Sequence, residues 1–186
     1  MKKQITIFML FILLGAGVNL SFARRERDER KLFDVIQEAM AKPEGDGKQE
    51  SAPISAQSLF QVGDPCPEII LNNVRTNKPT NLKEISKGKV TVIIYMQTSS
   101  AACRKELEDI NALLAIFPEL NVVAISVDAG NSVRILKYIE QNNFPFIFLR
   151  DTSFMTIELF GFSFAPATVI LGKNGKIFYL KGFNYR

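Results

Sequence analysis

Two nearly continuous apolar segments, rich in β-branched residues, constrain the fold of this chain more than any other feature. They are "KVTVIIYM", from Lys89 to Met96, and "LNVVAISVD", from Leu120 to Asp128. Such segments are typical of strands that are buried on both faces of a parallel sheet. Between them, the residues after Cys103 place apolar side chains at helical spacing. The alternation of strands and helices predicts an α/β sheet with parallel central strands.

The rest of the pattern predicts further elements around this centre. Strands are expected at 68–74, 144–149, 167–171 and 176–180, a turn at 75–80, and helical segments at 81–88, 132–142 and 152–161. Asn174-Gly175, between the last two strands, is typical of a type I′ turn and predicts a C-terminal β-hairpin with antiparallel edge strands. The predicted fold is therefore a central mixed sheet flanked by helices.

Residues 1–23 have the pattern of a secretory signal peptide. Lys2 and Lys3 precede a short apolar stretch, which ends in the small residues Ser21 and Ala23. Cleavage is expected after Ala23, which predicts a mature chain in the periplasm or outside the cell. The alternative is an uncleaved membrane anchor, through which alone we expect any membrane association. Two glycines and an asparagine interrupt the apolar stretch, which favours cleavage.

The mature chain is expected to have three parts. Residues 24–42 are strongly charged but carry apolar residues at helical spacing, which predicts a short amphipathic helix. Residues 43–58 are rich in Pro, Gly, Ser and charge, as in a linker. Residues 59–186 are expected to form the folded domain.

Composition excludes several classes of function. The chain has no histidine, which excludes Ser-His-Asp and Cys-His catalysis. With two cysteines and no histidine, a zinc site is not expected, nor is any other metal or cofactor. The formal net charge is +4, and the basic residues form no stripe with interleaved aromatics, so nucleic acid is not an expected partner.

Four motifs, in the correct order, resemble those of the thioredoxin fold. They are "VGDPCPEI" from Val62, "NLKEISKGKVTVIIYM" from Asn81, "AACRKEL" from Ala101 and "APATVILGKNGKI" from Ala165. The chain is most similar in these motifs to the secreted TlpA/ResA-like thiol-disulfide oxidoreductases, with the AhpC/TSA peroxiredoxin group as a relative. That family usually adds a helix after the hairpin. This chain stops six residues past Leu180, so the final helix is expected to be missing.

The resemblance places the family's paired cysteines on Ser100 and Cys103, and its tryptophan on Ser99. In a Cys-x-x-Cys enzyme the first thiol lies at a helix N-terminus and attacks the substrate disulfide, and the second thiol resolves the mixed disulfide. Serine cannot form a disulfide. We interpret Ser100 as the N-cap of the helix, because without a histidine base a nucleophilic serine is disfavoured.

Two interpretations of Cys103 stay open. By resemblance it occupies the resolving position, where it would act as a single thiol on substrate sulfur. Alternatively it is a small buried apolar residue, as free cysteine often is. Arg104 and Glu106 also match family positions, but composition alone makes them ordinary surface charges of the first helical turn.

Cys66 and the segment Ala165-Pro166 complete the candidate site. Cys66 stands between two prolines and must be extended there. It is a candidate second thiol, but the resemblance places its motif away from Cys103, which disfavours a disulfide between them. Pro166 matches the family's cis-proline. The resemblance implies that Ala165 and Pro166 lie beside the active-site sulfur and offer backbone to an extended substrate.

These residues leave three hypotheses. The first is a secreted protein of the thiol-disulfide oxidoreductase type with a remodelled Ser-x-x-Cys site, acting on or binding protein thiols or a redox partner protein. The second is a redox-inactive binding module with the same fold. The third is a peroxiredoxin-type peroxidase, which would require a proline where this chain has Met96. Whether the chain is an enzyme is left open at this point.

Overall fold

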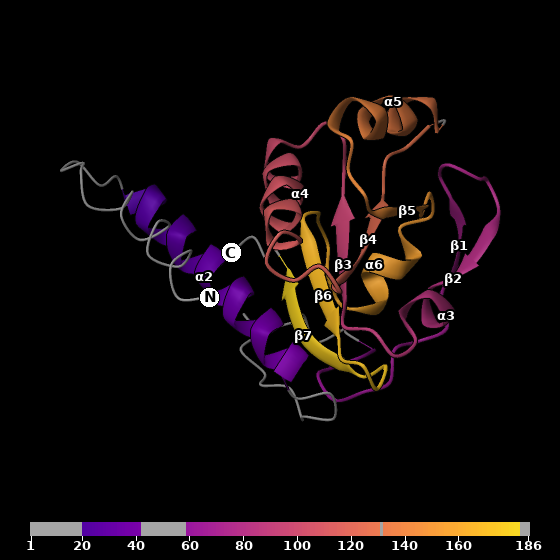
Figure 1. Cartoon of the computed structure of the whole chain (residues 1–186). Coiled ribbons are helices and arrows are strands. Elements are labelled where there is room, and N and C mark those ends of the chain that lie inside the picture. Colours follow the sequence, from indigo (N-terminus) through magenta and orange to yellow (C-terminus); the bar gives the residue numbers. More distant parts are fainter. Residues whose placement is uncertain (1–19, 42–58, 131, 183–186) are drawn as a thin grey trace. The chain divides into compact units, whose positions relative to one another are not determined.

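The computed structural model describes residues 20–41, 59–130 and 132–182, with the backbone alone for residues 20–29 (Figure 1). The chain divides into two compact units, residues 1–34 and 35–186. Helix α2, Leu20–Ala41, begins in the first unit and ends in the second. It includes the predicted cleavage position. Residues 1–19 of the predicted signal peptide and the predicted linker lie outside the described residues. No helix in the described ranges has the length and apolar character needed to cross a membrane.

The centre of the second unit is a parallel pair of strands, as predicted. Strand β3, Thr91–Met96, pairs with β4, Asn121–Ser126, over the full length of both strands. Every residue of β3 is buried, as expected of a strand covered on both faces. Because the two strands are parallel, both carboxyl ends lie at the same edge of the sheet.

Seven strands form one mixed sheet in the order β2-β1-β5-β4-β3-β6-β7 (Figure 1). Strand β5, Ile147–Arg150, continues the parallel pairing beyond β4. The antiparallel strands β1, Ile70–Asn73, and β2, Pro79–Asn81, complete that side. On the other side lies the antiparallel hairpin of β6, Ala167–Leu171, and β7, Ile177–Gly182. The predicted mixed sheet with a C-terminal hairpin is confirmed.

Four helices of the second unit connect these strands: α3, Leu82–Ser86; α4, Ala101–Leu113; α5, Val133–Asn142; and α6, Met155–Leu159. Each of the four helices begins within three residues of the start that the sequence predicts. Helix α5 ends at Asn142, and its C-cap residue, Asn143, has a left-handed backbone conformation with φ 51°. Asparagine adopts this conformation more readily than most residues, which is why it often ends a helix.

Different helices cover the two faces of the sheet. Tyr95 lies in the same buried cluster as Ile157 of α6 and Val169 of β6, so α6 covers the face to which these strand residues point. Successive side chains of a strand point to opposite faces. Thr168, next to Val169, donates its hydroxyl hydrogen to Glu106 Oε1 of α4 at 3.1 Å. Helix α4 therefore covers the other face.

The structure corrects the turn expected at 75–80. Residues Pro79–Asn81 of that segment form strand β2. Strand β2 is the last strand on its side of the sheet, and a proline without an N–H group is tolerated in an edge strand.

The predicted type I′ turn of the last hairpin is wrong. That turn requires positive φ at both central residues. Gly175 has a φ of 76°, but Asn174 is not among the residues with positive φ. The Gly175 N–H donates to the Gly172 carbonyl at 2.9 Å, and the Gly172 N–H donates to the Lys176 carbonyl at 2.9 Å. The connection is therefore longer than the two-residue loop of a type I′ hairpin.

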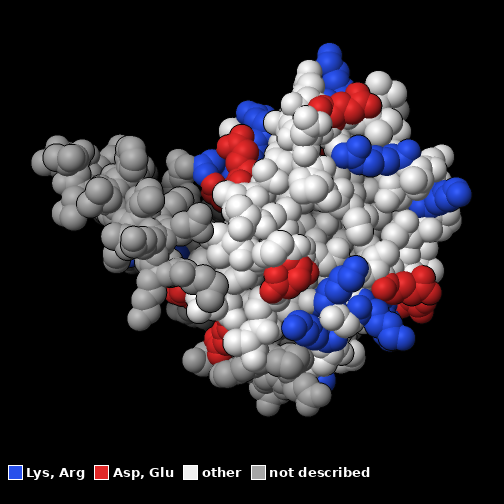
Figure 2. All heavy atoms as spheres, in the orientation of Figure 1, with Lys and Arg blue, Asp and Glu red and all other residues white. Residues whose placement is uncertain are grey.

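Opposite charges lie close together on the visible face of the second unit. Figure 2 shows Lys and Arg side chains next to Asp and Glu side chains around a broad area without charges. On helix α4, Lys105 and Asp109 form an ion pair one turn apart. Pairs at this spacing stabilise a helix by only about 0.3 kcal/mol.

A buried carboxylate organises the connection between β5 and α6. Asp151 is 1% exposed. Its Oδ1 accepts hydrogen bonds from the N–H and hydroxyl of Ser153, and its Oδ2 from the N–H and hydroxyl of Thr156. Burial alone would raise the pKa of Asp151, but these four hydrogen bonds to the charged form outweigh burial and lower that pKa. The Tyr95 hydroxyl donates to the Thr156 carbonyl at 3.1 Å, so the connection is tied to the central strand.

We predict that Asp151→Asn lowers the free energy of unfolding by about 1–3 kcal/mol at pH 7, because the amide presents a donor where donors already point. The folded state lowers the pKa of Asp151, so this contribution is present above the unfolded value of about 4 and is lost as pH falls through the folded value. Urea unfolding between pH 3 and 7 measures it. The control is Asp64→Asn, whose carboxylate accepts one exposed bond from Gln61 N–H. A deficit that does not shrink in acid, or an equal deficit in the control, would contradict the assignment.

Candidate functional site

The candidate site is the corner where β3 ends and α4 begins. Residues Gln97–Ser100 connect the two elements, and the Ser100 N–H donates to the Gln97 carbonyl at 3.1 Å. Thr98 is held more firmly. Its N–H donates to both carboxylate oxygens of Asp128, at 3.1 and 2.9 Å, and its hydroxyl donates to Asp128 Oδ1 at 3.0 Å. The corner is therefore tied to Asp128, two residues past the end of the neighbouring parallel strand.

Asp128 is itself fixed by the end of β4. The Ser126 hydroxyl donates to Asp128 Oδ2 at 2.8 Å, and the Asp128 N–H donates to Ser126 Oγ at 3.2 Å. From the helix side, Arg104 Nη1 donates to the Thr98 carbonyl at 3.2 Å. Sequence reasoning did not single out Thr98, Ser126 or Asp128. The signal was present, because polar residues at the carboxyl ends of adjacent parallel strands lie at one edge of the sheet.

Ser100 is the N-cap of α4, as predicted. Its backbone is extended, with φ −83° and ψ 120°, and its hydroxyl oxygen accepts from the Cys103 N–H at 3.2 Å. This geometry satisfies one of the N–H groups that a helix leaves without a partner in its first turn. The hydroxyl is thus already engaged in a structural hydrogen bond.

Cys103 lies one turn inside α4 and is 0% exposed. Burial raises the pKa of the Cys103 thiol, because a thiolate is poorly solvated there. The hydrogen bonds to Ser100 and Gln97 act in the opposite direction, while the carboxylates of Glu106 and Asp128 add to the rise. The net shift is upward, so at neutral pH the sulfur is a protonated thiol and a weak nucleophile.

The segment around Pro166 lies at the same edge of the sheet as this corner. Strand β6 is antiparallel to β3 and pairs Ala167 with Tyr95, one residue before the end of β3. The Ala165-Pro166 peptide bond is cis, as the resemblance implies. The bond between Thr168 and Glu106 joins this segment to α4. Glu106 and Arg104 are therefore partly buried structural contacts, and the expectation of ordinary surface charges is wrong.

Cys66 lies at the opposite edge. Its N–H donates to the Gly175 carbonyl at 2.9 Å, in the turn that follows the carboxyl end of β6, and β6 runs antiparallel to β3. Cys66 is 5% exposed. Burial raises the pKa of the Cys66 thiol to about 11, although the nearby Lys83 ammonium lowers it in part. Both cysteines are free. The structure therefore brings Ser100 and Cys103 together in one corner and places Cys66 at the other edge of the sheet.

The described residues contain no group of three or more Cys, Asp or Glu side chains that could hold a metal ion. What the corner offers is a capped helix start, a shielded thiol and the backbone of the Pro166 segment. The Ala165 backbone makes no hydrogen bond with any described residue.

Comparison with known proteins gives a family and a relative. The family model of the AhpC/TSA family matches residues 62–180. Among curated proteins, the chain is similar to the thiol-disulfide oxidoreductase ResA of Geobacillus thermodenitrificans, with 24% identity over 124 residues. This alignment covers 65% of the chain and 69% of that relative.

Solved structures show a similar fold. A thiol:disulfide interchange protein assigned as DsbE, from Chlorobium tepidum, has a TM-score of 0.58 and 23% identity, over 66% of this chain and 86% of that chain. The thioredoxin domain of a thiol-disulfide oxidoreductase from Bacteroides vulgatus has a TM-score of 0.57 and 17% identity, over 65% and 88%. A secreted disulfide oxidoreductase of Mycobacterium tuberculosis has a TM-score of 0.52 and 16% identity, over 59% and 80%.

We predict that Ser100→Ala lowers the free energy of unfolding by about 1 kcal/mol, since it removes the acceptor of the Cys103 N–H. Chemical unfolding of both proteins under reducing conditions measures the difference. Ser132→Ala is the matched control, because Ser132 is the N-cap of α5 but makes no side-chain capping bond, so a change within about 0.5 kcal/mol is expected. If the two variants lose the same stability, the special role of the Ser100 cap is refuted.

Proposed function

Since the chain belongs to the AhpC/TSA family and has the thioredoxin fold, we propose that it binds protein thiols or a redox partner protein without turning over disulfides. The observation that carries this proposal is the pair of residues at the corner. A capping hydroxyl stands where the resemblance places the reactive thiol, and the remaining sulfur is 0% exposed. The comparisons support a thiol-disulfide oxidoreductase relationship, while the site favours binding over catalysis.

The chemistry of disulfide exchange explains why one sulfur is not enough. A thiolate attacks one sulfur of the substrate disulfide, a mixed disulfide forms, and the second substrate sulfur leaves as a thiolate. A second enzyme thiol then displaces the first substrate sulfur and forms an enzyme disulfide, which an external dithiol reduces. Cys103 has no second cysteine beside it, and its pKa is raised. The protonated Cys103 thiol is poorly suited to the attack, and no second thiol is in place for the resolution.

The binding mode that we propose is the addition of an extended partner segment at the Pro166 edge. Its support is the Ala165 backbone, which pairs with no described residue. Phe164, just before it, is 51% exposed and can contribute apolar contact area. Main-chain pairing gives affinity in such complexes, and side-chain contacts select the partner.

We propose that binding takes place in the periplasm or outside the cell. The support is the basic and apolar pattern of residues 1–23, which is typical of a secretory signal peptide. Residues 24–186 would then be the mature chain, with 24–42 as an amphipathic helix, 43–58 as a linker and 59–186 as the binding domain. The similar disulfide oxidoreductase of Mycobacterium tuberculosis is described as secreted.

The experiment is insulin reduction with dithiothreitol as the terminal reductant. We predict that the wild-type chain accelerates it little, and that Ser100→Cys raises the rate by about tenfold or more, because it adds a thiol at the helix N-terminus with Cys103 in place to resolve. Ser99→Cys is the control, since it adds a thiol one residue before the cap.

Two outcomes would contradict the proposal. The first is wild-type turnover as fast as that of Ser100→Cys. The second is a folded Ser100→Cys variant with no gain over Ser99→Cys, which would show that Ser100 does not occupy the nucleophile position. Consumption of hydrogen peroxide by the wild-type chain would instead support the peroxidase hypothesis. The sequence disfavours that hypothesis, because Met96 occupies the position where a peroxiredoxin requires a proline.

A further inference from the structure

A small polar cavity lies at the carboxyl end of β5, and we infer that it binds a small oxyanion. Its volume is about 90 Å³, and its lining is Asn72, Asn73, Val74, Asn77, Ser132, Arg150 and Thr152. Six of these seven residues are polar, none is acidic and one carries a positive charge. This binding site is separate from the proposed thiol-binding function and does not depend on it.

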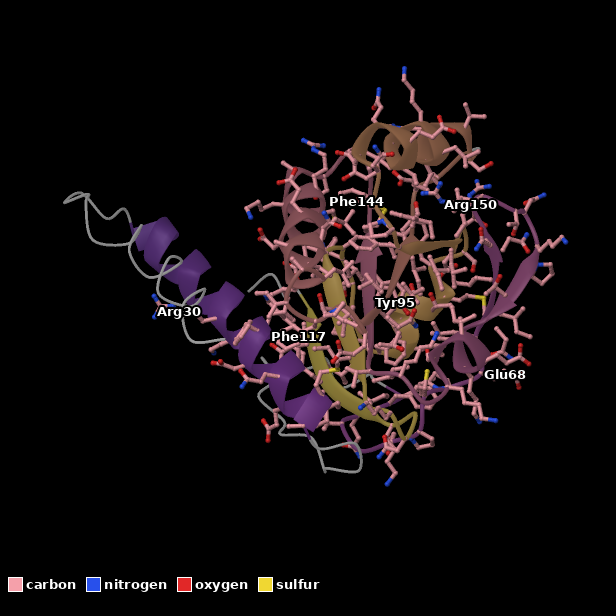
Figure 3. All side chains as sticks on the ribbon, in the orientation of Figure 1. Arg30, Glu68, Tyr95, Phe117, Phe144 and Arg150 are labelled. Carbon is pink, nitrogen blue, oxygen red and sulfur yellow. The ribbon has the colours of Figure 1, made fainter. Side chains whose placement is uncertain are left out.

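Arg150 supplies the positive charge of this cavity. Its Nε atom is buried and has no hydrogen-bond partner among the described residues. The guanidinium forms no hydrogen bond or ion pair with the described residues. The guanidinium carries five donors in a planar fork that matches the oxygens of a phosphate, sulfate or carboxylate group. Figure 3 labels Arg150 on the side of the sheet where β5 pairs with β1. Arg150 lines the cavity, so an oxyanion there would pair with the part of the guanidinium that the cavity reaches rather than with the enclosed Nε.

The other walls of the cavity also present donors. Asn72 pairs directly with Arg150 across β1 and β5. Asn77 lies in the β1–β2 turn with φ 54°, and no hydrogen bond of its side chain is formed with the described residues. Asn73 already uses its side-chain oxygen to accept from the N–H groups of the turn, so its amide NH₂ remains as a donor. The amides therefore line the cavity with polar groups that carry no charge.

The start of helix α5 adds a favourable dipole. Ser132 is the N-cap residue, yet its hydroxyl makes no capping hydrogen bond. The positive end of the helix dipole favours an anion. Ser132 is among the residues that line the cavity, so this end of α5 lies beside it. Helix and guanidinium thus favour the same sign of charge.

Size and charge select the class of ligand. A water molecule takes about 30 Å³ in the liquid, so the cavity has room for roughly three waters, or one small oxyanion. A cation is disfavoured beside Arg150 in a lining without carboxylates, and an apolar molecule would leave the donors unsatisfied. Phosphate, sulfate and a carboxylate such as acetate share the chemistry that fits.

The cavity is near the thiol corner but is not part of it. In the parallel pairing of β4 with β5, Arg150 is opposite Ser126, and Ser126 donates to Asp128. Asp128 in turn holds Thr98 of the corner. The two sites therefore share one edge of the sheet, with the end of β4 between them.

The test is isothermal titration of the full chain with inorganic phosphate, sulfate and acetate, each at the same ionic strength held with chloride. We predict saturable binding of at least one of the three, and their ranking distinguishes a tetrahedral from a planar oxyanion. Arg150→Gln and Asn77→Asp should each weaken that binding by about tenfold or more, since one removes the fork and the other places a carboxylate in the cavity. The control is Arg134→Gln, which removes an exposed charge from helix α5. This variant should bind the anion as the wild type does.

Asn77→Asp keeps the size of the side chain and a residue type that tolerates positive φ, so it tests the site even if Arg150→Gln does not fold. Amide NMR shifts locate the ligand, and they should change most at Asn77 and Ser132. No saturable binding, equal binding by all variants, or shifts centred on Ser100 and Cys103 would each overturn the inference.

Discussion

The parallel pairing of β3 with β4 is the constraint on which the rest of the structure depends. It requires two strands without exposed faces, and the apolar, β-branched residues of both strands meet that requirement. Since parallel strands end at one edge, the residues after Met96 and after Ser126 must lie side by side. The carboxylate of Asp128 then reaches the N–H of Thr98, and the start of α4 is placed. The same edge also carries the Pro166 segment and the Arg150 cavity.

Two opposing effects meet at Cys103. The N-terminus of a helix favours a thiolate, and the Ser100 hydroxyl bond acts in the same direction. Complete burial opposes it, and so do the carboxylates of Glu106 and Asp128. Burial is the largest of these effects and the pKa rises. The same residues that make the corner rigid therefore keep its sulfur protonated. A rigid corner with an unreactive thiol is suited to binding rather than to thiol-disulfide exchange.

The main features of the fold could be predicted from the sequence because they follow from period and burial. Continuous apolar strands, helical spacing and a Ser N-cap are local signals, and the structure confirms the parallel centre and the Ser100 cap. The turn around Asn174 could not be predicted, because Asn-Gly is compatible with more than one hairpin loop and the strand register decides between them. Thr98, Asp128 and Arg150 act through partners about 24 to 78 residues away in the chain, and single-sequence patterns do not show such pairs. The shielding of Cys103 also depends on tertiary packing, which is why two interpretations of it were open before the structure.

The most direct test of the account is the alkylation of Cys103 in the native chain as a function of pH. Iodoacetamide labelling, read by mass spectrometry of the two cysteine peptides, gives a rate for Cys103 with buried Cys66 as an internal reference. The account predicts slow labelling of both thiols at neutral pH, with the Cys103 rate rising only above the usual thiol pKa of about 8.5. Rapid labelling of Cys103 at pH 7, with a midpoint below that value, would show an accessible, activated thiolate and would contradict the assignment of a binding module.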